Sequence, residues 1–197
     1  ELNNLKAQLN PHFMFNSMNS IRALIEENPE LAKDSITKLS NILRSTLLMG
    51  RKKLVTVEEE MNVIFDYLKL ESIRYEERLQ VKINIEENTH RCLIPPLVIH
   101  SLVENAIKHG ISRLTDGGEI SISVKTEGKK LNIVVENTGN FDPKGKTLTG
   151  IGLVNTKQRL ELLFAGKASF GISNSGHGTV KAEITLPLIE NYESNNN

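Results

Sequence analysis

A histidine lies near the start of the chain in a setting that suits chemistry at its ring. His12 follows Pro11 and precedes Phe13, inside the stretch Gln8–Asn16, which otherwise has helical spacing. A proline inside a helix costs about 3 kcal/mol, so packing alone explains this pattern poorly. A neutral imidazole is nucleophilic near pH 7, and Asn16, one helical turn on, can orient the ring or hold a water molecule. A core histidine bonded to a backbone carbonyl is the plainer alternative.

A second group of polar residues lies on a helix predicted over residues 95–109. Four of them are spaced so that they share one face of that helix: Ser101, Asn105, Lys108 and His109. An asparagine oxygen is a hard ligand that suits Mg²⁺, and a lysine one turn on can contact phosphate oxygens. Glu104 lies beside them. A merely solvated helix face is the alternative that spacing leaves open.

Glycines mark a third stretch, where the backbone can approach a ligand closely. The segment Asn137–Gly139 ends a predicted strand, and Gly150–Leu153 opens a predicted helix after a loop. Unpaired N–H groups at a helix N-terminus attract an anion. The stretch is neither a dinucleotide-binding fingerprint nor a P-loop, because it follows a loop late in the sheet and no Gly-Lys-Ser/Thr follows it. A further turn, Gly176–Thr179, leads into the last strand. Ordinary turn chemistry is the alternative for both stretches.

The composition excludes several classes of protein. Twenty-four basic and 24 acidic residues cancel, so no overall field attracts the chain to nucleic acid or an anionic membrane. The single cysteine, Cys92, allows no intrachain disulfide. No apolar run reaches the 18 residues of a membrane-spanning helix, and no secretory signal is present. The five histidines lack zinc-site spacing, and no GxSxG motif predicts a serine hydrolase.

Residues 1–55 are predicted to form two helices that meet at Asn28-Pro29. Apolar residues recur at three-to-four spacing along both helices: Leu2, Leu5, Leu9, Phe13, Met14, Met18, Ile21 and Ile25 in the first, and Ala32, Ile36, Leu39, Leu43 and Leu47 in the second. Such wide faces cannot bury each other completely, which favours a four-helix bundle made by two copies. Packing of the hairpin against its own downstream domain is the alternative.

Residues 56–188 are predicted to form an α+β domain. Thr56–Glu59 matches a capping box, and it opens a helix with a core face of Val57, Met61, Ile64, Leu68 and Tyr75. Period-two alternation predicts four strands, around residues 81–85, 120–124, 131–135 and 180–186, with helices near 95–109 and 152–164. This order indicates a mixed or antiparallel sheet with helices on one face. Residues 189–197 are predicted to be a disordered tail.

In their order and separation, these motifs resemble those of sensor histidine kinases of the LytS type. The ATP-binding half of that family has the Bergerat fold, which it shares with DNA gyrase and the MutL repair proteins. The resemblance extends from Leu5 to about Pro187, and it is most specific over Leu5–Ile21, which resembles the family's histidine box. It implies a helical hairpin in a dimeric four-helix bundle over residues 1–55, and a Bergerat-type α/β sandwich with a mixed sheet over residues 56–188.

The resemblance also implies roles for individual residues. His12 matches the phosphoacceptor. Pro95–Gly110 matches the N box, in which Asn105 implies the Mg²⁺ ligand, Lys108 and His109 imply phosphate contacts, and Glu104 belongs to the same nucleotide-binding set.

Two glycine-containing motifs complete the implied ATP site. Gly150, Gly152 and Leu153 match the glycine box that closes over the triphosphate, and the loop between Asn140 and Thr149 is its expected lid. Gly178 and Thr179 match the motif below the adenine.

The chain departs from the wider superfamily at two positions. Asn137, with Gly139 two residues on, stands at the strand end where most members have an aspartate that accepts from the adenine amino group. An asparagine oxygen can accept the same bond without the charge. Phe13 follows His12 where many histidine kinases have an acidic base; the LytS-type box is also apolar there, so the base is unidentified.

The resemblance implies a protein-histidine kinase that uses ATP and Mg²⁺. It is expected to phosphorylate His12, to transfer the phosphoryl group to an aspartate of a response regulator receiver domain, and to act as a homodimer without nucleic acid. Residues before Glu1 are expected to carry membrane segments, which would make this chain the cytoplasmic part of a protein anchored in the bacterial inner membrane. Two alternatives are a Bergerat-fold ATPase without histidine phosphorylation and a pseudokinase scaffold.

Overall fold

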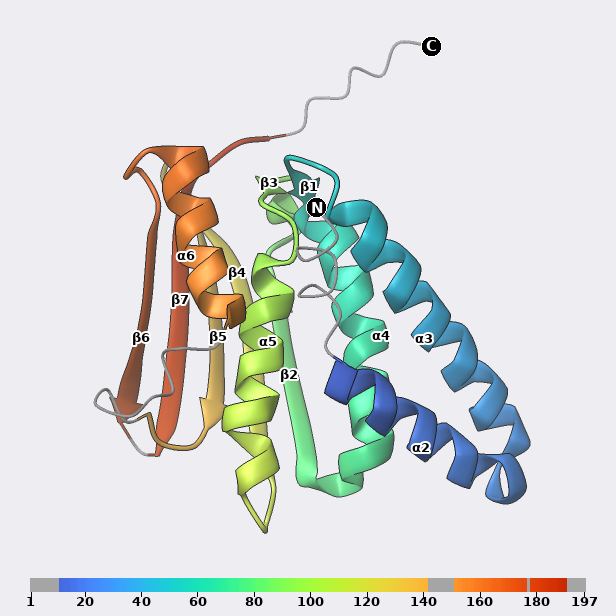
Figure 1. Ribbon diagram of the computed structural model, residues 1–197. Helices are drawn as coiled ribbons and strands as arrows, with labels where there is room; N and C mark the ends of the chain where they lie inside the picture. The colour runs from blue at the N-terminus through green and yellow to red at the C-terminus, as the bar shows by residue number, and fades with distance from the viewer. Residues whose placement is uncertain (1–10, 142–150, 177, 191–197) are drawn as a thin grey trace, which may run out of the picture.

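A helical hairpin and an α/β sandwich lie side by side in the computed structural model, which describes residues 11–141, 151–176 and 178–190. Helices α2 (Pro11–Glu27) and α3 (Pro29–Met49) form the hairpin. Helix α4 (Val57–Tyr75) lies between the hairpin and the sheet (Figure 1). The described helices include none that is long and apolar enough to cross a membrane.

The hairpin turn forms where the sequence predicted it. Asn28 caps α3, because its side-chain oxygen accepts a hydrogen bond from the Leu31 N–H at 3.1 Å. Pro29 occupies the first turn, where a missing N–H is harmless. Pro11 was predicted to lie inside a helix. It is the first described residue of α2, and that prediction depends on residues 1–10, which lie outside the described range.

The buried face of the hairpin differs from the predicted stripes. The sequence predicted that a second copy covers these stripes, and Ile36, Met18 and Ile25 are each more than half exposed in the single chain. Polar residues share the buried side with apolar ones, and they were not predicted there: Ser17 on α2 and Ser35 and Thr46 on α3. The reason is that the hairpin packs against α4, which is the alternative arrangement that the sequence left open. A second apolar surface is therefore left facing outward.

The sheet is mixed, as predicted, with strand order β2-β4-β5-β7-β6. Strand β2 (Leu79–Ile85) pairs in parallel with β4 (Gly118–Glu127), and the remaining pairs are antiparallel. Strands β5 (Lys130–Thr138) and β7 (Thr179–Pro187) were also predicted. The edge strand β6 (Ser169–Gly176) was not, because most of its residues are exposed and its apolar alternation is short.

Helices α5 (Val98–His109) and α6 (Ile151–Phe164) cover the same face of the sheet, with α4 beside them (Figure 1). The core lies between these helices and the alternate strand residues that point toward them: Ile120, Ile122, Val124, Leu131, Ile133, Val135, Ile184 and Leu186. Three short 3₁₀ helices connect the elements: Glu76–Arg78, Glu87–Thr89 and Ile111–Arg113. The predicted fold class is confirmed.

A small two-stranded sheet joins the end of the hairpin segment to the sandwich. Strand β1 (Val55–Thr56) pairs antiparallel with β3 (Leu93–Ile94). Directly after β1 the predicted capping box is present: the Thr56 hydroxyl accepts from the Glu59 N–H at 3.1 Å, and the Glu59 carboxylate accepts from the Thr56 N–H at 2.8 Å.

The predicted disordered tail over residues 189–197 is wrong for its first two residues. The Ile189 carbonyl accepts a 2.7 Å hydrogen bond from the Leu93 N–H, and Glu190 forms a β-bridge with Cys92. Backbone pairing with the β3 segment therefore holds the chain to residue 190, and residues 191–197 lie outside the described range.

The start of α5 depends on a carboxylate from another helix. Leu97, the residue before α5, has a left-handed φ of 64° and offers no side-chain cap. Glu60 of α4 is fully buried and accepts from the Leu97 N–H at 3.0 Å and from the His100 N–H at 2.9 Å. Burial raises the pKa of Glu60 to about 7, against these bonds and the charge of Arg159, which lower it. Glu60 thus supplies the cap that α5 lacks.

We expect Glu60→Ala to lower the free energy of unfolding by about 2–5 kcal/mol, because two buried N–H groups lose their acceptor at about 1–3 kcal/mol each. Urea denaturation measures the change. The matched control is Glu58→Ala on the same turn of α4, because Glu58 is exposed, and this variant should stay within about 0.5 kcal/mol of the parent. A Glu60→Ala variant as stable as the control would contradict this role of Glu60.

Candidate active site

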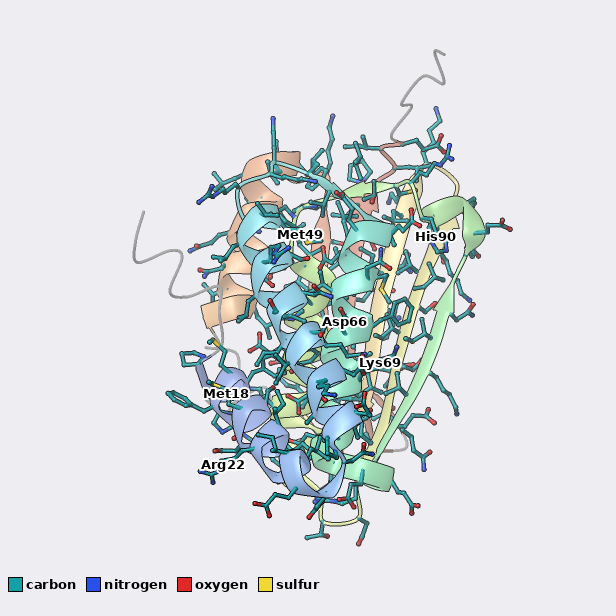
Figure 2. The ribbon with its side chains drawn as sticks, turned by 90° about the vertical axis from the view of Figure 1, so that its right-hand side faces the viewer. Met18, Arg22, Met49, Asp66, Lys69 and His90 are labelled. Carbon is teal, nitrogen blue, oxygen red and sulfur yellow. The ribbon has the colours of Figure 1, made fainter. Side chains whose placement is uncertain are left out.

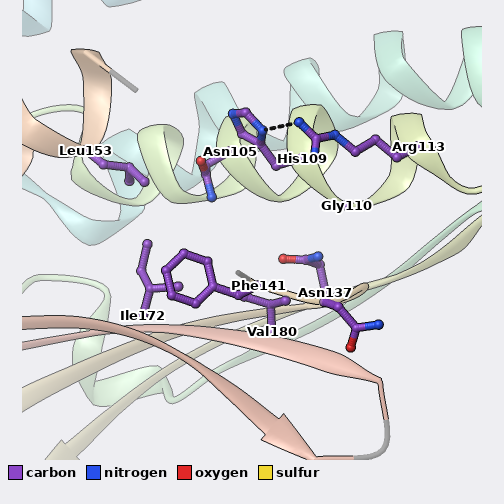
Figure 3. A pocket seen from close by; sticks show the side chains of 10 residues that line it. Asn105, His109, Gly110, Arg113, Asn137, Phe141, Leu153, Ile172 and Val180 are labelled. Atoms are coloured by element: carbon purple, nitrogen blue, oxygen red, sulfur yellow. Dashed lines mark hydrogen bonds between the residues drawn. The ribbon is translucent and has the colours of Figure 1, made fainter. Parts of the chain in front are cut away.

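One cavity between α5 and the sheet brings together four of the residues predicted to bind nucleotide: Asn105, His109, Asn137 and Leu153. Asn105 and His109 project from α5, Asn137 from the end of β5, and Leu153 from α6 (Figure 3). Gly110 from the predicted N box and Asn140 and Phe141 from the start of the expected lid also line this cavity, which is called the nucleotide cavity after that prediction. The sequence did not predict the remaining lining residues: Arg113, Ile172 and Val180. One wall is therefore polar and the facing wall is largely apolar.

Asn137 and Gly110 are in close contact at the deep end of the nucleotide cavity. A Cβ atom at Gly110 would lie 2.2 Å from the Asn137 side-chain nitrogen, so only glycine fits there. That nitrogen donates to the Thr138 carbonyl at 2.9 Å. Asn137 is 6% exposed, and its side-chain oxygen remains available as an acceptor inside the cavity.

An arginine and a histidine lie together on the helical wall of the nucleotide cavity. The Arg113 guanidinium lies 3.2 Å from the Nδ1 atom of His109, as the dashed line in Figure 3 marks. Burial lowers the pKa of His109, and the neighbouring charges of Arg113 and Lys108 lower it further. His109 is therefore a neutral ring beside a permanent cation. A phosphate group suits this wall.

Two further predicted nucleotide-binding residues, Thr179 and Gly139, are not among the described residues that line this cavity. Thr179 is the first residue of β7, where its hydroxyl donates to the Gly176 carbonyl at 2.9 Å. Gly139 donates its N–H to the Gly178 carbonyl at 2.8 Å in the same region. Gly150 and the expected lid, apart from Asn140 and Phe141, lie outside the described residues. Gly152 belongs to the first turn of α6.

A second cavity, the His12 cavity, lies on the other side of α5. His12 and Phe13 enter it from α2, and two predicted nucleotide-binding residues, Glu104 and Lys108, line it from α5. The remaining lining residues were not predicted: Tyr67, Glu71, Arg74 and Tyr75 from α4, and Ile107 and Ser112. The single polar face predicted for α5 therefore divides. Asn105 and His109 face the nucleotide cavity, and Glu104 and Lys108 face His12.

Three aromatic rings fix the position of α2 against the domain. Phe13 is 6% exposed, and its ring centroid is 4.7 Å from that of Tyr67 on α4. Tyr67 in turn meets His100 of α5 edge-on, with centroids 5.0 Å apart. Such contacts add to the burial of apolar area. The residue directly after His12 is thus the anchor that holds His12 beside α4 and α5.

Asn16 lies against the ring of His12, as the sequence predicted. Its amide nitrogen is 3.2 Å from Nδ1 and 3.3 Å from Nε2. The amide is therefore in contact with both ring nitrogens. Asn16 can therefore restrict how the ring turns on an exposed part of α2.

Two carboxylates and their neighbours set the charge of the His12 cavity. Burial raises the pKa of Glu71 to about 7; the Arg74 charge lowers it and the Glu104 charge raises it. Glu71 and Glu60 both fall on the apolar face of α4, where an unpaired glutamate is rare. A glutamate on a predicted apolar helix face is the signal by which the sequence could have identified both residues as buried and functional candidates.

Two family models match the chain in sequence order. The one described as "Histidine kinase" matches residues 1–79, and the one described as "Histidine kinase-, DNA gyrase B-, and HSP90-like ATPase" matches residues 96–190. The fold and the two cavities thus define a protein that joins a phosphoacceptor-type hairpin to an ATP-binding domain of the Bergerat type. The chain belongs to the histidine kinase family, as the sequence predicted.

Named relatives and solved structures agree with this assignment. "Sensor histidine kinase/phosphatase LytS" of Staphylococcus aureus strain MRSA252 is 34% identical over 91% of this chain, which spans 33% of that protein. The Acinetobacter baumannii histidine kinase AdeS has a TM-score of 0.53 at 15% identity, covering 85% of this chain and 83% of that one. Histidine kinase ThkA in complex with response regulator protein TrrA has a TM-score of 0.51 at 14% identity, covering 91% and 60%. At this identity the solved structures show the shared fold.

We expect Glu71→Gln to stabilise the chain at high pH and to change little near pH 4. The raised pKa means that folded Glu71 keeps a proton up to about pH 7, whereas the unfolded side chain loses it near 4.5. The free energy of unfolding that the parent owes to Glu71 is therefore fully present below pH 4.5 and is lost as the pH rises through 7. The uncharged glutamine has no such loss. The free energy of unfolding of the variant should exceed that of the parent by up to about 3 kcal/mol at pH 8.5.

Urea denaturation at pH 4 and pH 8.5 tests this expectation. Glu77→Gln is the matched control, because Glu77 is exposed just beyond α4, and its difference from the parent should be the same at both pH values. A Glu71→Gln difference that is likewise independent of pH would show that Glu71 titrates normally.

Proposed function

We propose that this chain is the catalytic core of a two-component sensor kinase, which transfers the γ-phosphoryl group of ATP to a ring nitrogen of His12. The observation that carries the proposal is the division of α5. One row of its side chains, Asn105 and His109, lines the nucleotide cavity, and the next row, Glu104 and Lys108, lines the His12 cavity. A single helix therefore separates the donor site from the acceptor by its own width.

The donor set of the nucleotide cavity fits ATP with Mg²⁺. The Asn105 side-chain oxygen is a suitable Mg²⁺ ligand, and the metal when bound offsets phosphate charge. Arg113 and His109 can supply hydrogen bonds for phosphate oxygens. Lys108, from the neighbouring row of α5, remains a proposed phosphate contact. The apolar wall, which includes Phe141 and Ile172, suits a flat base. The glycine box at Gly150, Gly152 and Leu153, and Thr179 with Gly139, remain proposed nucleotide contacts.

His12 is the proposed nucleophile, and its surroundings support that role. The ring is exposed at the mouth of its cavity, while Phe13 beside it is buried. Asn16 contacts the ring and can limit its rotation, which orients the ring for an incoming phosphorus atom. Lys108 lies on the α5 row between the two cavities, where a cation stabilises a phosphoryl group in transit.

The proposed partners are a receiver domain and a second copy of the chain. The ThkA structure contains a response regulator protein, which supports the first. Apolar side chains on the outer surface of the hairpin support the second: Phe15 is 68% exposed, Met18 57% and Ile25 55%. Figure 2 shows Met18 on α2, pointing away from the domain. Membrane anchoring of the whole protein stays a prediction that rests on resemblance.

We expect His12→Gln to abolish labelling of the protein by γ-labelled ATP while ATP affinity stays within about twofold, because His12 and the nucleotide residues line different cavities. The label on the parent should be acid-labile and base-stable. The matched control is His90→Gln, because His90 lies at the opposite end of α4 (Figure 2), and it should label like the parent.

The same assay separates the alternatives to a kinase. Label found only as free phosphate would indicate an ATPase, and no turnover at all would indicate a pseudokinase scaffold. Label that survives His12→Gln would move the phosphoacceptor to another residue.

We expect Asn137→Ala to weaken ATP binding about tenfold, equivalent to about 1.4 kcal/mol, and to reduce the preference for ATP over GTP. The change removes the acceptor proposed to read the adenine amino group, which GTP lacks. Asn137→Asp should bind ATP at least as tightly and at most about tenfold tighter, because the gain of a charged acceptor is opposed by its desolvation.

Titration of both nucleotides against the variants checks the adenine site. Asn132→Ala is the matched control, because Asn132 lies on β5 but faces the other side of the sheet, and it should keep the parent affinities. If Asn137→Ala also keeps them, the base binds elsewhere.

A further inference from the structure

Glu71 is a buried carboxylate to which the mechanism above gives no role. Its side chain is 4% exposed, and its Oε2 atom has no hydrogen-bond partner among the residues that the structure describes. Arg74 is the cation beside it, but its Nη1 atom lies 3.8 Å from Oε2, which is beyond hydrogen-bond reach. A buried polar atom in this state calls for an explanation. One explanation is that Oε2 of Glu71 carries a proton during only part of a reaction cycle.

Glu71 and His12 line the same small cavity. Its volume is about 40 Å³, which is room for one or a few water molecules. Phe13, next to His12, packs on Tyr67, and the Tyr67 hydroxyl bonds the Glu71 carboxyl one turn further along α4. The contact that anchors His12 therefore also holds Glu71 in place. Because both side chains line a cavity with room for water, a water molecule there can relay a proton between them.

The groups around Glu71 adjust its affinity for a proton. Arg74 and Tyr75 flank it on α4, Glu104 and Lys108 face it from α5, and His12 faces it from α2. Burial and the Glu104 charge raise the pKa of Glu71, and Arg74 opposes them, with a result of about 7. A carboxylate in this range both accepts and releases a proton near neutral pH.

We propose that Glu71 accepts the proton that the ring of His12 loses during phosphoryl transfer, an assignment that rests on the kinase function proposed above. One ring nitrogen forms a bond to the γ-phosphorus, and the bond from that phosphorus to the bridging oxygen breaks, so ADP leaves with the electron pair. The ring is then a cation that carries a proton on its other nitrogen. That proton passes to Oε2 of Glu71, which leaves a neutral phosphohistidine and a neutral carboxylic acid. Glu71 returns the proton to water before the next turnover.

Glu104 is the other carboxylate of the His12 cavity. It is partly exposed, whereas Glu71 is buried. The charge of Glu104 raises the pKa of Glu71, so Glu104 acts on the proposed proton acceptor from the α5 side of the cavity. Substitution separates this role from that of Glu71.

The test compares Glu71→Gln and Glu71→Asp with the parent in single-turnover labelling of His12 at saturating ATP. Asp66→Asn is the matched control, because Asp66 is a carboxylate of α4 that lies outside the His12 cavity (Figure 2). Glu71→Gln should slow labelling about 100-fold or more, with ATP affinity within about twofold of the parent. Glu71→Asp should restore part of the rate, and Asp66→Asn should keep all of it.

The reverse reaction separates catalysis from structure. Phosphorylated His12 mixed with ADP should form ATP more slowly in Glu71→Gln by the same factor as the forward reaction, because a catalytic group lowers one barrier in both directions. The position of the equilibrium should not change. A structural role would alter nucleotide affinity or that equilibrium, and would overturn the assignment.

Three further outcomes would overturn it. Labelling by Glu71→Gln within about threefold of the parent would remove Glu71 as the acceptor and leave the kinase function standing. Loss of rate in Glu104→Gln, with Glu71→Gln unaffected, would assign the proton to Glu104. A parent that takes no label would remove the kinase function and this assignment together.

Discussion

The contact between Glu60 and the start of α5 is the constraint on which the rest of the molecule depends. A helix that begins after a left-handed leucine has no cap of its own, and its first N–H groups would be buried without acceptors. Glu60 reaches from α4 to two of them. On the other side, Arg159 of α6 donates to the Pro96 carbonyl at 2.6 Å. The three helices that build both cavities are therefore joined at one loop.

That joint explains why α5 can serve two cavities at once. The helix is held at its first turn, so the direction of each row of its side chains is set relative to α4 and α6 together. Asn105 and His109 then face the sheet end where Asn137 packs on Gly110. Glu104 and Lys108 face the hairpin. A rotation of α5 by one residue, about 100°, would turn both rows away from the directions that they have here.

Features that depend on short sequence separations could be predicted. The cap at Asn28, the capping box at Thr56 and the alternating strands involve residues a few positions apart. Local sequence patterns were therefore enough to predict them. Strand β6 could not, because its pairing with β7 outweighs a weak alternation of its own. The family could be predicted because its motifs are local too.

The polar residues of α5 are divided between two cavities because different elements pack on each side of the helix. The spacing of residues within α5 does not show which elements these are. Spacing put Lys108 and Asn105 on one broad face, and only the position of the hairpin separates them. The buried positions on α3 shifted for the same reason, because the partner surface is α4. Glu71 was visible as a charge on an apolar face of α4, but its neighbour His12 lies some sixty residues earlier.

The pairing of β1 with β3 also limits how far His12 can move from the sandwich. Residues Val57 and Glu58 bond the backbone of Cys92 and His90, so α4 is attached to the sandwich from its first turn. The only tether between α3 and that attachment runs from Met49 to Val55, which spans about 20 Å when fully extended. The hairpin can therefore move only a short distance from the sandwich. Any movement of the hairpin relative to the sandwich therefore pivots about this tether, with α3 as its lever.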